Sequence, residues 1–245
     1  MAVAELILIR HGESMGNAAA AAANAAQAEV IVIDQRDADV PLSPAGLQQA
    51  QALGAGLQEA LADQRPTMIW SSPYIRAVQT AEVALEAAGL SLPIAVDERL
   101  RDRELGVLDL LTTIGVANRF ALEAERRRWL GKFYHRPPGG ESWADVVLRI
   151  RSFLRDLDDV PNGTRAVIIC HDALVQLFRY VCERLNEQQV LQIGASDPVK
   201  NVSLTQFERT DGGWQLLRYN DVTHLEQAGA PITEHRGEVD VRATR

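Results

Sequence analysis

The sequence predicts a three-layer α/β/α fold with a largely parallel central sheet, a helical cap insertion and a C-terminal hairpin. Short apolar runs of β type alternate along the chain with amphipathic helical patterns, an arrangement typical of a parallel sheet covered on both faces. The chain has 245 residues, 47% of them hydrophobic, which favours one large core. The expected strands are Leu6–Ile9, Met68–Trp70, Ile94–Val96, Ala166–Cys170, Val202–Phe207 and Trp214–Tyr219.

The last two expected strands form the hairpin. They flank the sequence Thr210-Asp211-Gly212-Gly213. Aspartate and glycine readily adopt the left-handed backbone that a tight hairpin turn requires.

Helical patterns occupy the segments between the strands. Ser43-Pro44 supplies a cap and a first-turn proline for one helix, and Ser72-Pro73 is expected to start the next in the same way. A third helix is indicated by the apolar stripe over residues 146–157, and a fourth begins just after His171. The alanine tract Ala18–Ala26 is helical by propensity.

Residues 109–140 look inserted, and we expect them to form a helical cap over the carboxyl edge of the sheet. The segment ends in Pro137-Pro138-Gly139-Gly140, a turn that returns the chain to the core. Its basic run Arg126–Arg128 is expected to be a solvated helix face, with attraction of an anionic substrate as the alternative. The aromatic side chains expected to pack the cap onto the core are Trp129, Phe133 and Trp143.

One domain over residues 1–220 follows from this pattern, with the cap inserted into it. Residues 221–245 are polar and aperiodic, so we expect a loosely held tail.

The net charge of −8 argues against a nucleic-acid partner. The N-terminus lacks the basic and apolar regions of a signal peptide, and no apolar stretch approaches membrane-spanning length. We therefore expect a cytoplasmic protein without a membrane partner. Cys170 and Cys182 lie in apolar stretches and are expected to be reduced core thiols.

Basic side chains follow three of the expected strands. Arg10 and His11 end the first strand, Arg76 lies in the first helical turn after the second, and His171 leaves the buried strand Ala166–Cys170. The carboxyl ends of parallel strands meet at one edge of a sheet, where α/β folds bind ligands. Helix N-termini at this edge favour anions. Two arginines and two histidines around one point suit a tetrahedral dianion.

Four motifs in this order resemble the histidine phosphatase superfamily, in the branch that contains phosphoglycerate mutases and small phosphatases. They are Arg10-His11-Gly12-Glu13-Ser14 with Asn17, Pro41-Leu42-Ser43-Pro44-Ala45-Gly46 with Gln49-Ala50, Ser71-Ser72-Pro73 with Arg76-Ala77 and Thr80-Ala81, and His171. Arg-His-Gly alone is a weak signal, but the first two motifs together are specific.

The resemblance implies a role for each matched residue. His11 would be the nucleophile that forms a phosphohistidine, while Arg10, Arg76 and His171 would hold the phosphoryl oxygens and Asn17 would add a neutral donor. His11 must then be neutral, which nearby positive charges favour. No metal or other cofactor is implied, because the arginines supply the countercharge.

A general acid must protonate the leaving oxygen, and three carboxylates compete for this role. Asp102 ranks first, because it occupies the position at which this branch carries its acid, more often a glutamate. Glu104 ranks second because its longer side chain offers reach. Asp172 ranks third: it resembles the acid of the other branch, acid phosphatases and phytases, but is most simply a first-turn acid that suits the helix dipole.

The sequence thus predicts a metal-independent phosphatase that hydrolyses a small phosphorylated metabolite through a phosphohistidine. One alternative is a cofactor-dependent phosphoglycerate mutase, although Ala18–Ala23 and Asp102-Arg103-Glu104-Leu105-Gly106 depart from the motifs of family mutases. Another is a non-catalytic phosphate-binding module with a misplaced acid. The sequence fixes neither the metabolite nor the oligomeric state, and a homodimer is compatible with it.

Overall fold

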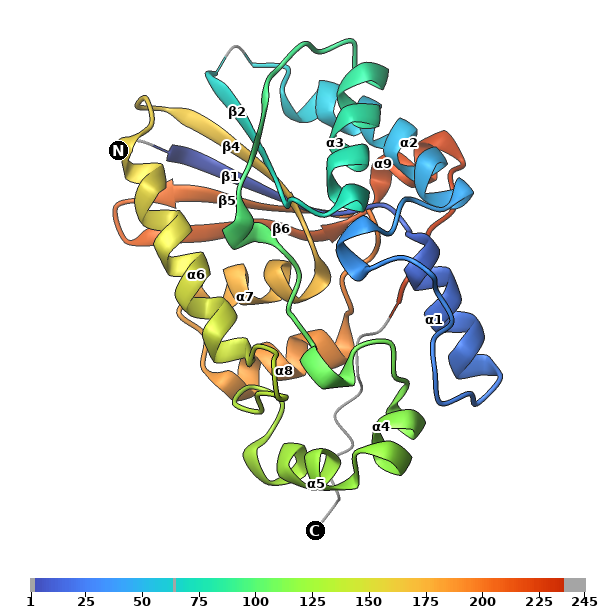
Figure 1. The fold of residues 1–245 in the computed structure, drawn as a ribbon. Coiled ribbons are helices and arrows are strands. Elements are labelled where there is room, and N and C mark those ends of the chain that lie inside the picture. Colours follow the sequence, from blue (N-terminus) through green and yellow to red (C-terminus); the bar gives the residue numbers. More distant parts are fainter. Residues whose placement is uncertain (1–2, 64, 236–245) are drawn as a thin grey trace.

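The computed structural model describes residues 3–63 and 65–235. Within them one sheet has the strand order β3-β2-β4-β1-β5-β6 (Figure 1). The strands β3, β2, β4 and β1 run parallel, and β5 and β6 form an antiparallel hairpin at one edge. The largely parallel sheet and the hairpin are therefore confirmed. The strands are β1 (Val3–Arg10), β2 (Thr67–Ser71), β3 (Ile94–Val96), β4 (Thr164–Cys170), β5 (Leu204–Thr210) and β6 (Gly213–Asp221).

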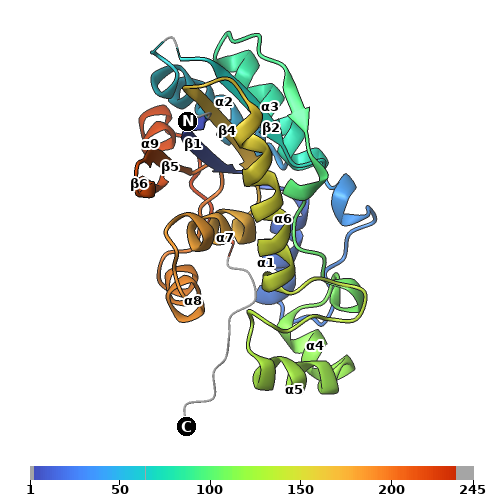
Figure 2. The same cartoon turned by 90° about the vertical axis from the view of Figure 1, so that its left-hand side faces the viewer.

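Helices cover both faces of this sheet, as expected for an α/β/α fold. The helices of the described residues are α1 (Met15–Ala25), α2 (Pro44–Ala60), α3 (Ile75–Ala87), α4 (Thr113–Arg119), α5 (Ala121–Leu130), α6 (Trp143–Asp156), α7 (Asp172–Cys182), α8 (Glu187–Ser196) and α9 (Thr223–Ala228). Helices α2, α3 and α9 pack on one face, and α6 and α7 pack on the other (Figures 1 and 2).

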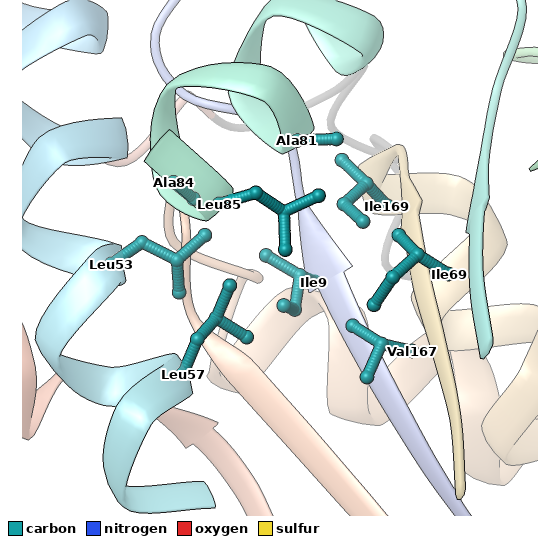
Figure 3. Close-up of a pocket in the computed structure, with 9 residues that line it drawn as sticks. All are labelled: Ile9, Leu53, Leu57, Ile69, Ala81, Ala84, Leu85, Val167 and Ile169. Carbon is teal, nitrogen blue, oxygen red and sulfur yellow. The ribbon is translucent and has the colours of Figure 1, made fainter. Parts of the chain in front are cut away.

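The core is divided by the alternation of side chains along the strands. In β1, Leu6 and Leu8 join the cluster under α6 and α7, whereas Ile7 and Ile9 join the cluster under α2 and α3. Figure 3 shows the second cluster, where leucines from α2 and α3 meet Ile9 and its neighbours on β2 and β4. Burial on both faces explains why the central strands read as continuous apolar runs.

The two Ser-Pro signals act differently. Ser43 caps α2 by accepting a hydrogen bond from the backbone N–H of Gly46, and the helix begins at Pro44, as predicted. The expectation that Ser72-Pro73 starts the next helix is wrong by two residues, because α3 begins at Ile75. The hydroxyl oxygen of Ser72 instead accepts a bond from the N–H of Tyr74, 3.2 Å away, and this forms a turn before the helix.

The cap segment contains α4 and α5, which lie at the bottom of Figure 1. Phe133 and Trp143 are buried as expected. The prediction for Trp129 is wrong: it is 85% exposed. It lies seven residues after Leu122, which is 76% exposed, so both side chains share the outer face of α5. In the basic run on this helix Arg126 and Arg128 are exposed, as expected, whereas Arg127 is half-buried, and Arg126 pairs with Glu123 at 3.0 Å.

The expected loose tail is wrong for residues 221–235, since β6 extends to Asp221 and Val222 is buried. Helix α9 packs on α2 and buries Leu225, and the carbonyl oxygen of Pro231 accepts a hydrogen bond from the side chain of Gln49. A helix of this length presents too few apolar residues to form a periodic pattern. The rest of the expected tail, residues 236–245, lies outside the described residues.

Cys170 and Cys182 are free and buried, as expected for core thiols, and burial raises the pKa of both. Across residues 3–63 and 65–235, every helix is too short or too polar to cross a membrane.

Candidate active site

Three strand ends bring the predicted site residues together. The backbone N–H of His11 donates to the carbonyl of Cys170, and that of Ser72 donates to the carbonyl of Ile169, both at 2.9 Å. These bonds continue the β1–β4 and β2–β4 ladders by one residue. As a result His11, Ser72 and His171 lie side by side at the carboxyl edge of the sheet, and the rings of the two histidines are 5.0 Å apart.

The loop after His11 is fixed by a close approach of two backbones. A Cβ atom on Gly12 would lie 2.7 Å from the carbonyl oxygen of Gly46, and one on Gly46 would lie 2.0 Å from that of Glu13. Only glycine fits both positions. The N–H of Gly12 donates to the hydroxyl of Thr80 at 3.0 Å, and that of Glu13 donates to the side chain of Gln49 at 2.8 Å. The sequence motifs therefore meet in one rigid loop.

His11 is held as a neutral imidazole. Its Nδ1 lies 2.6 Å from the carbonyl oxygen of Gly12. A carbonyl only accepts hydrogen bonds, so Nδ1 carries the proton and Nε2 keeps a lone pair. Burial lowers the pKa of His11 well below 6.5, and Arg76, His171 and Arg10 lower it further. This is the protonation state that a nucleophilic histidine needs.

His171 is fully buried beside His11 and does not itself line the adjacent pocket. Its Nε2 lies 2.8 Å from the hydroxyl of Ser72. Its Nδ1 is 3.3 Å from a carboxylate oxygen of Asp102 but is not aligned for a hydrogen bond, which leaves a buried nitrogen without a hydrogen-bond partner. Burial, followed by Arg76 and Arg149, lowers the pKa of His171 well below 6.5.

Arg76 enters the site from the first turn of α3. Its guanidinium is buried, lies over the ring of Tyr74 at 4.9 Å, and donates to both carboxylate oxygens of Asp37, at 3.0 and 3.2 Å. A third carboxylate oxygen, from Asp102, lies 3.4 Å away. These partners fix the direction of the guanidinium.

Arg10 and Asn17 complete the phosphate-binding set that the sequence predicted, and both line the pocket. Arg10 donates to backbone carbonyls, whereas its buried Nε has no hydrogen-bond partner within the described residues. Asn17 completes a capping box at the start of α1: its amide oxygen accepts a bond from the N–H of Ser14. This arrangement leaves the amide NH₂ of Asn17 as the group able to donate to a ligand.

The three candidate acids differ in position. Asp102 lies against both His171 and Arg76, with 29% of its side chain exposed. Glu104 is farther out, with 48% exposed, and accepts a hydrogen bond from the hydroxyl of Tyr74 at 2.8 Å. Asp172 begins α7 and accepts a bond from Gln176. Of the three, Asp102 is the one that lies against both His171 and Arg76, which favours it as the acid.

A pocket of about 500 Å³ opens in front of these groups. Its floor includes Arg10, His11 and Arg76, and its outer wall is formed by residues before α2 and by the chain leading into the cap. Of the basic residues in the cap segment, Lys132 lines this pocket. Apolar side chains on the outer wall are Ile31, Ile33, Val40, Leu105, Leu110 and Leu111.

Sequence reasoning missed several neighbours of the site. Asp37 belongs to no motif, and its contact with Arg76 arises only because a short helix at Asp37–Asp39 lies against α3. Tyr74 follows the Ser-Pro pair, but nothing in the sequence indicated a hydroxyl directed at Glu104. His235, which also lines the pocket, was assigned to the tail.

The buried neutral histidines predict a loss of stability on acidification. His11 and His171 stay neutral in the folded protein, whereas both take up protons below pH 6.5 after unfolding. Stability is therefore complete above this pH and is lost below it, by on the order of 1 kcal/mol for each histidine between about pH 7.5 and about pH 5.5. Urea unfolding at these two pH values measures the difference. A His171→Gln variant should lose about half of this dependence, and an unchanged dependence would contradict the account.

Within residues 3–63 and 65–235, no group of three or more His, Cys, Asp or Glu side chains is placed to hold a metal ion.

Comparison with known proteins agrees with this geometry. The sequence matches the histidine phosphatase superfamily (branch 1) over residues 6–222. It is 28% identical to Phosphoglycerate mutase-like protein 4 of Arabidopsis thaliana over 92% of this chain and 89% of that protein. Its fold resembles that of mycobacterial glucosyl-3-phosphoglycerate phosphatase in complex with inorganic phosphate, with 26% identity, a TM-score of 0.66, and coverage of 90% of this chain and 99% of that one.

The fold also resembles that of YhfR of Bacillus stearothermophilus, with 25% identity and a TM-score of 0.70. The match covers 91% of this chain and 100% of that one. The matched region contains the three strand ends and the loop after His11. The chain therefore belongs to the histidine phosphatase superfamily (branch 1).

Proposed function

We propose that the protein is a phosphatase that hydrolyses a small phosphomonoester through a phosphohistidine on His11. The observation that carries the proposal is a buried neutral His11, whose Nε2 keeps its lone pair beside Arg10, Arg76 and His171. A nucleophile surrounded by fixed positive charge suits phosphoryl transfer, which depends mainly on positioning and on stabilising charge at the phosphoryl oxygens.

In the first step Nε2 of His11 attacks phosphorus, and the bond from phosphorus to the ester oxygen breaks. Arg10 and Arg76 bind the phosphoryl oxygens. With the hydroxyl of Ser72 donating to Nε2 of His171, Nδ1 of that histidine carries a proton and becomes a further donor. A phosphate bound in the pocket would thus satisfy the buried Nε of Arg10, which lacks a partner within the described residues.

As the general acid, Asp102 gives a proton to the leaving alkoxide, so the alcohol departs neutral. The same carboxylate then takes a proton from water as the water attacks phosphorus and the N–P bond breaks, which releases phosphate and restores His11. The proximity of Asp102 to both His171 and Arg76 supports this role over Glu104, which is farther from the phosphoryl site.

The pocket carries charges of both signs outside its phosphate-binding groups. Its wall has the carboxylates of Glu104, Asp109 and Asp172 and the cations Arg103 and Lys132. Burial and the nearby Asp37 raise the pKa of Asp109.

The proposal is tested by rapid acid quenching of the enzyme with a radiolabelled ester. We expect an acid-labile, base-stable label on His11 that appears before free phosphate. Turnover without this label would overturn the proposal. With a monophosphoglycerate, isomer formation that depends on a bisphosphate primer would indicate a mutase. Phosphate binding without turnover of p-nitrophenyl phosphate would indicate a binding module.

Removal of divalent metals should leave turnover unchanged, because the arginines supply the positive charge that a metal would otherwise provide. Phosphate release in the presence of a chelator measures this directly. Inorganic phosphate and vanadate should inhibit, since both resemble the transferred group. A loss of activity that added metal restores would contradict the expectation.

A further inference from the structure

We propose that residues 231–235, here named the C-terminal strap, are positioning residues of the catalytic site. The inference rests on the proposed function, since it concerns the same site. The strap follows α9 and lies beyond residue 222, where the match to the superfamily ends. It contacts Arg10 and Glu13 of the catalytic loop (residues 10–13) directly and reaches the backbone of His11 through Asn201.

The first contact orients Arg10. Both terminal nitrogens of its guanidinium lie 3.5 Å from the carbonyl oxygen of His235, and one also donates to the carbonyl of Val199. Arg10 is buried, and burial lowers its pKa. Backbone carbonyls are neutral acceptors, so they direct the guanidinium without cancelling the charge that a phosphoryl group needs.

The second contact reaches the backbone of His11. The hydroxyl of Thr233 donates to the side-chain oxygen of Asn201 at 3.0 Å, and the side-chain nitrogen of Asn201 donates to the carbonyl of His11 at 2.9 Å. The N–H of Asn201 also donates to the carbonyl of Thr233. Asn201 is fully buried, so each of these bonds is costly to lose.

The third contact reaches Glu13. The side-chain nitrogen of Gln49 donates to the hydroxyl of Thr233 at 2.7 Å, while its oxygen accepts from the N–H of Glu13. The imidazole Nε2 of His235 lies 3.0 Å from one carboxylate oxygen of Glu13, and the hydroxyl of Ser43 donates to the other at 2.7 Å. Through Glu13 the strap is thus connected to Ser43, the N-cap residue of α2.

These contacts give the strap a role in catalysis, because it holds a phosphate ligand and the backbone of the nucleophile at once. Small displacements of reacting groups cost large factors in rate. Thr233 is the central residue, since its hydroxyl both donates to Asn201 and accepts from Gln49.

The test compares Thr233→Val with Thr223→Val. The second variant removes a hydroxyl from the same part of the chain, but that hydroxyl bonds Asp221, away from the site. A chain ending at residue 230 is compared with one ending at 235 with an amidated C-terminus, which retains the strap and keeps the carbonyl of His235 neutral. Three quantities are measured: the Kd for inorganic phosphate by calorimetry, the single-turnover rate of phosphohistidine formation, and the thermal midpoint.

We expect Thr233→Val to slow phosphohistidine formation by about tenfold, and loss of the strap to slow it by about a hundredfold. Phosphate binding should weaken by about tenfold when the strap is absent, because Arg10 loses an orienting acceptor. Thr223→Val and the chain ending at 235 should match the parent protein in all three measurements. Phosphate binding is measurable without turnover, so the two proposals can fail separately.

Equal phosphate affinity and equal rates in the two truncated chains would overturn the proposal. So would tighter phosphate binding without the strap, since it would mean that the strap competes with phosphate for Arg10. A fall in thermal midpoint with unchanged affinity and rate would assign the strap a purely structural role, which also contradicts the proposal.

Discussion

His11→Ala should lower the rate of phosphomonoester hydrolysis by at least about 10⁴-fold, because no other group can replace the covalent nucleophile. The substitution removes Nε2 but leaves Arg10 and Arg76, so inorganic phosphate should still bind. The measurement is single-turnover hydrolysis of a labelled ester, together with phosphate binding by calorimetry. The variant should thus separate binding from chemistry.

His135→Gln is the matched control for this experiment. His135 is as buried as His11, but its Nε2 pairs with Glu123 in the cap segment, 3.1 Å away. Its replacement should leave turnover near that of the parent protein. Substantial hydrolysis by His11→Ala, with a normal burst of product, would refute the assignment of the nucleophile.

Asp102→Asn should slow the hydrolysis of alkyl phosphates by about 10²- to 10⁴-fold, the usual contribution of a general acid. Aryl phosphates should be affected far less, since their leaving groups depart without protonation. The physical basis is the position of the Asp102 carboxylate beside His171 and Arg76. The ratio of kcat for an alkyl and an aryl phosphate is the quantity to measure.

Glu104→Gln provides the comparison for Asp102. The amide keeps the size of the side chain and can still accept the hydrogen bond from Tyr74, but it cannot supply a proton. We expect its ratio of alkyl to aryl turnover to stay close to that of the parent protein. If Glu104→Gln shows the selective loss and Asp102→Asn does not, the ranking of the acids is wrong.

The sequence predicted the convergence of His11, Arg76 and His171, because it depends on features with long-range consequences. Buried apolar runs identify parallel strands, and the ends of such strands must meet at one edge. The glycines of the first two motifs are also understandable in retrospect, since Gly12 faces the backbone of Gly46 and Gly46 faces the backbone of Glu13.

Other features depend on contacts that no local pattern encodes. Asp37 contacts Arg76 across 39 residues, and Arg10 contacts His235 across 225. The aromatic character of Trp129 suggested packing, but its position on α5 directs it outward. The strap was assigned to a loose tail because its contacts are hydrogen bonds to distant residues rather than a repeating apolar stripe.

The groups that handle phosphorus stand at the ends of buried strands or in the first turn of the helix that follows, whereas the outer wall of the pocket, with Ile33 and Leu111, lies outside the sheet layers. In a two-step transfer the alcohol has already left when water attacks. The outer wall therefore affects the first step, in which the alcohol leaves, and does not affect the second step, in which water attacks. Under the proposed mechanism, substitutions in that wall would change which alcohol is preferred in the first step. They would leave the rate of phosphohistidine hydrolysis unchanged.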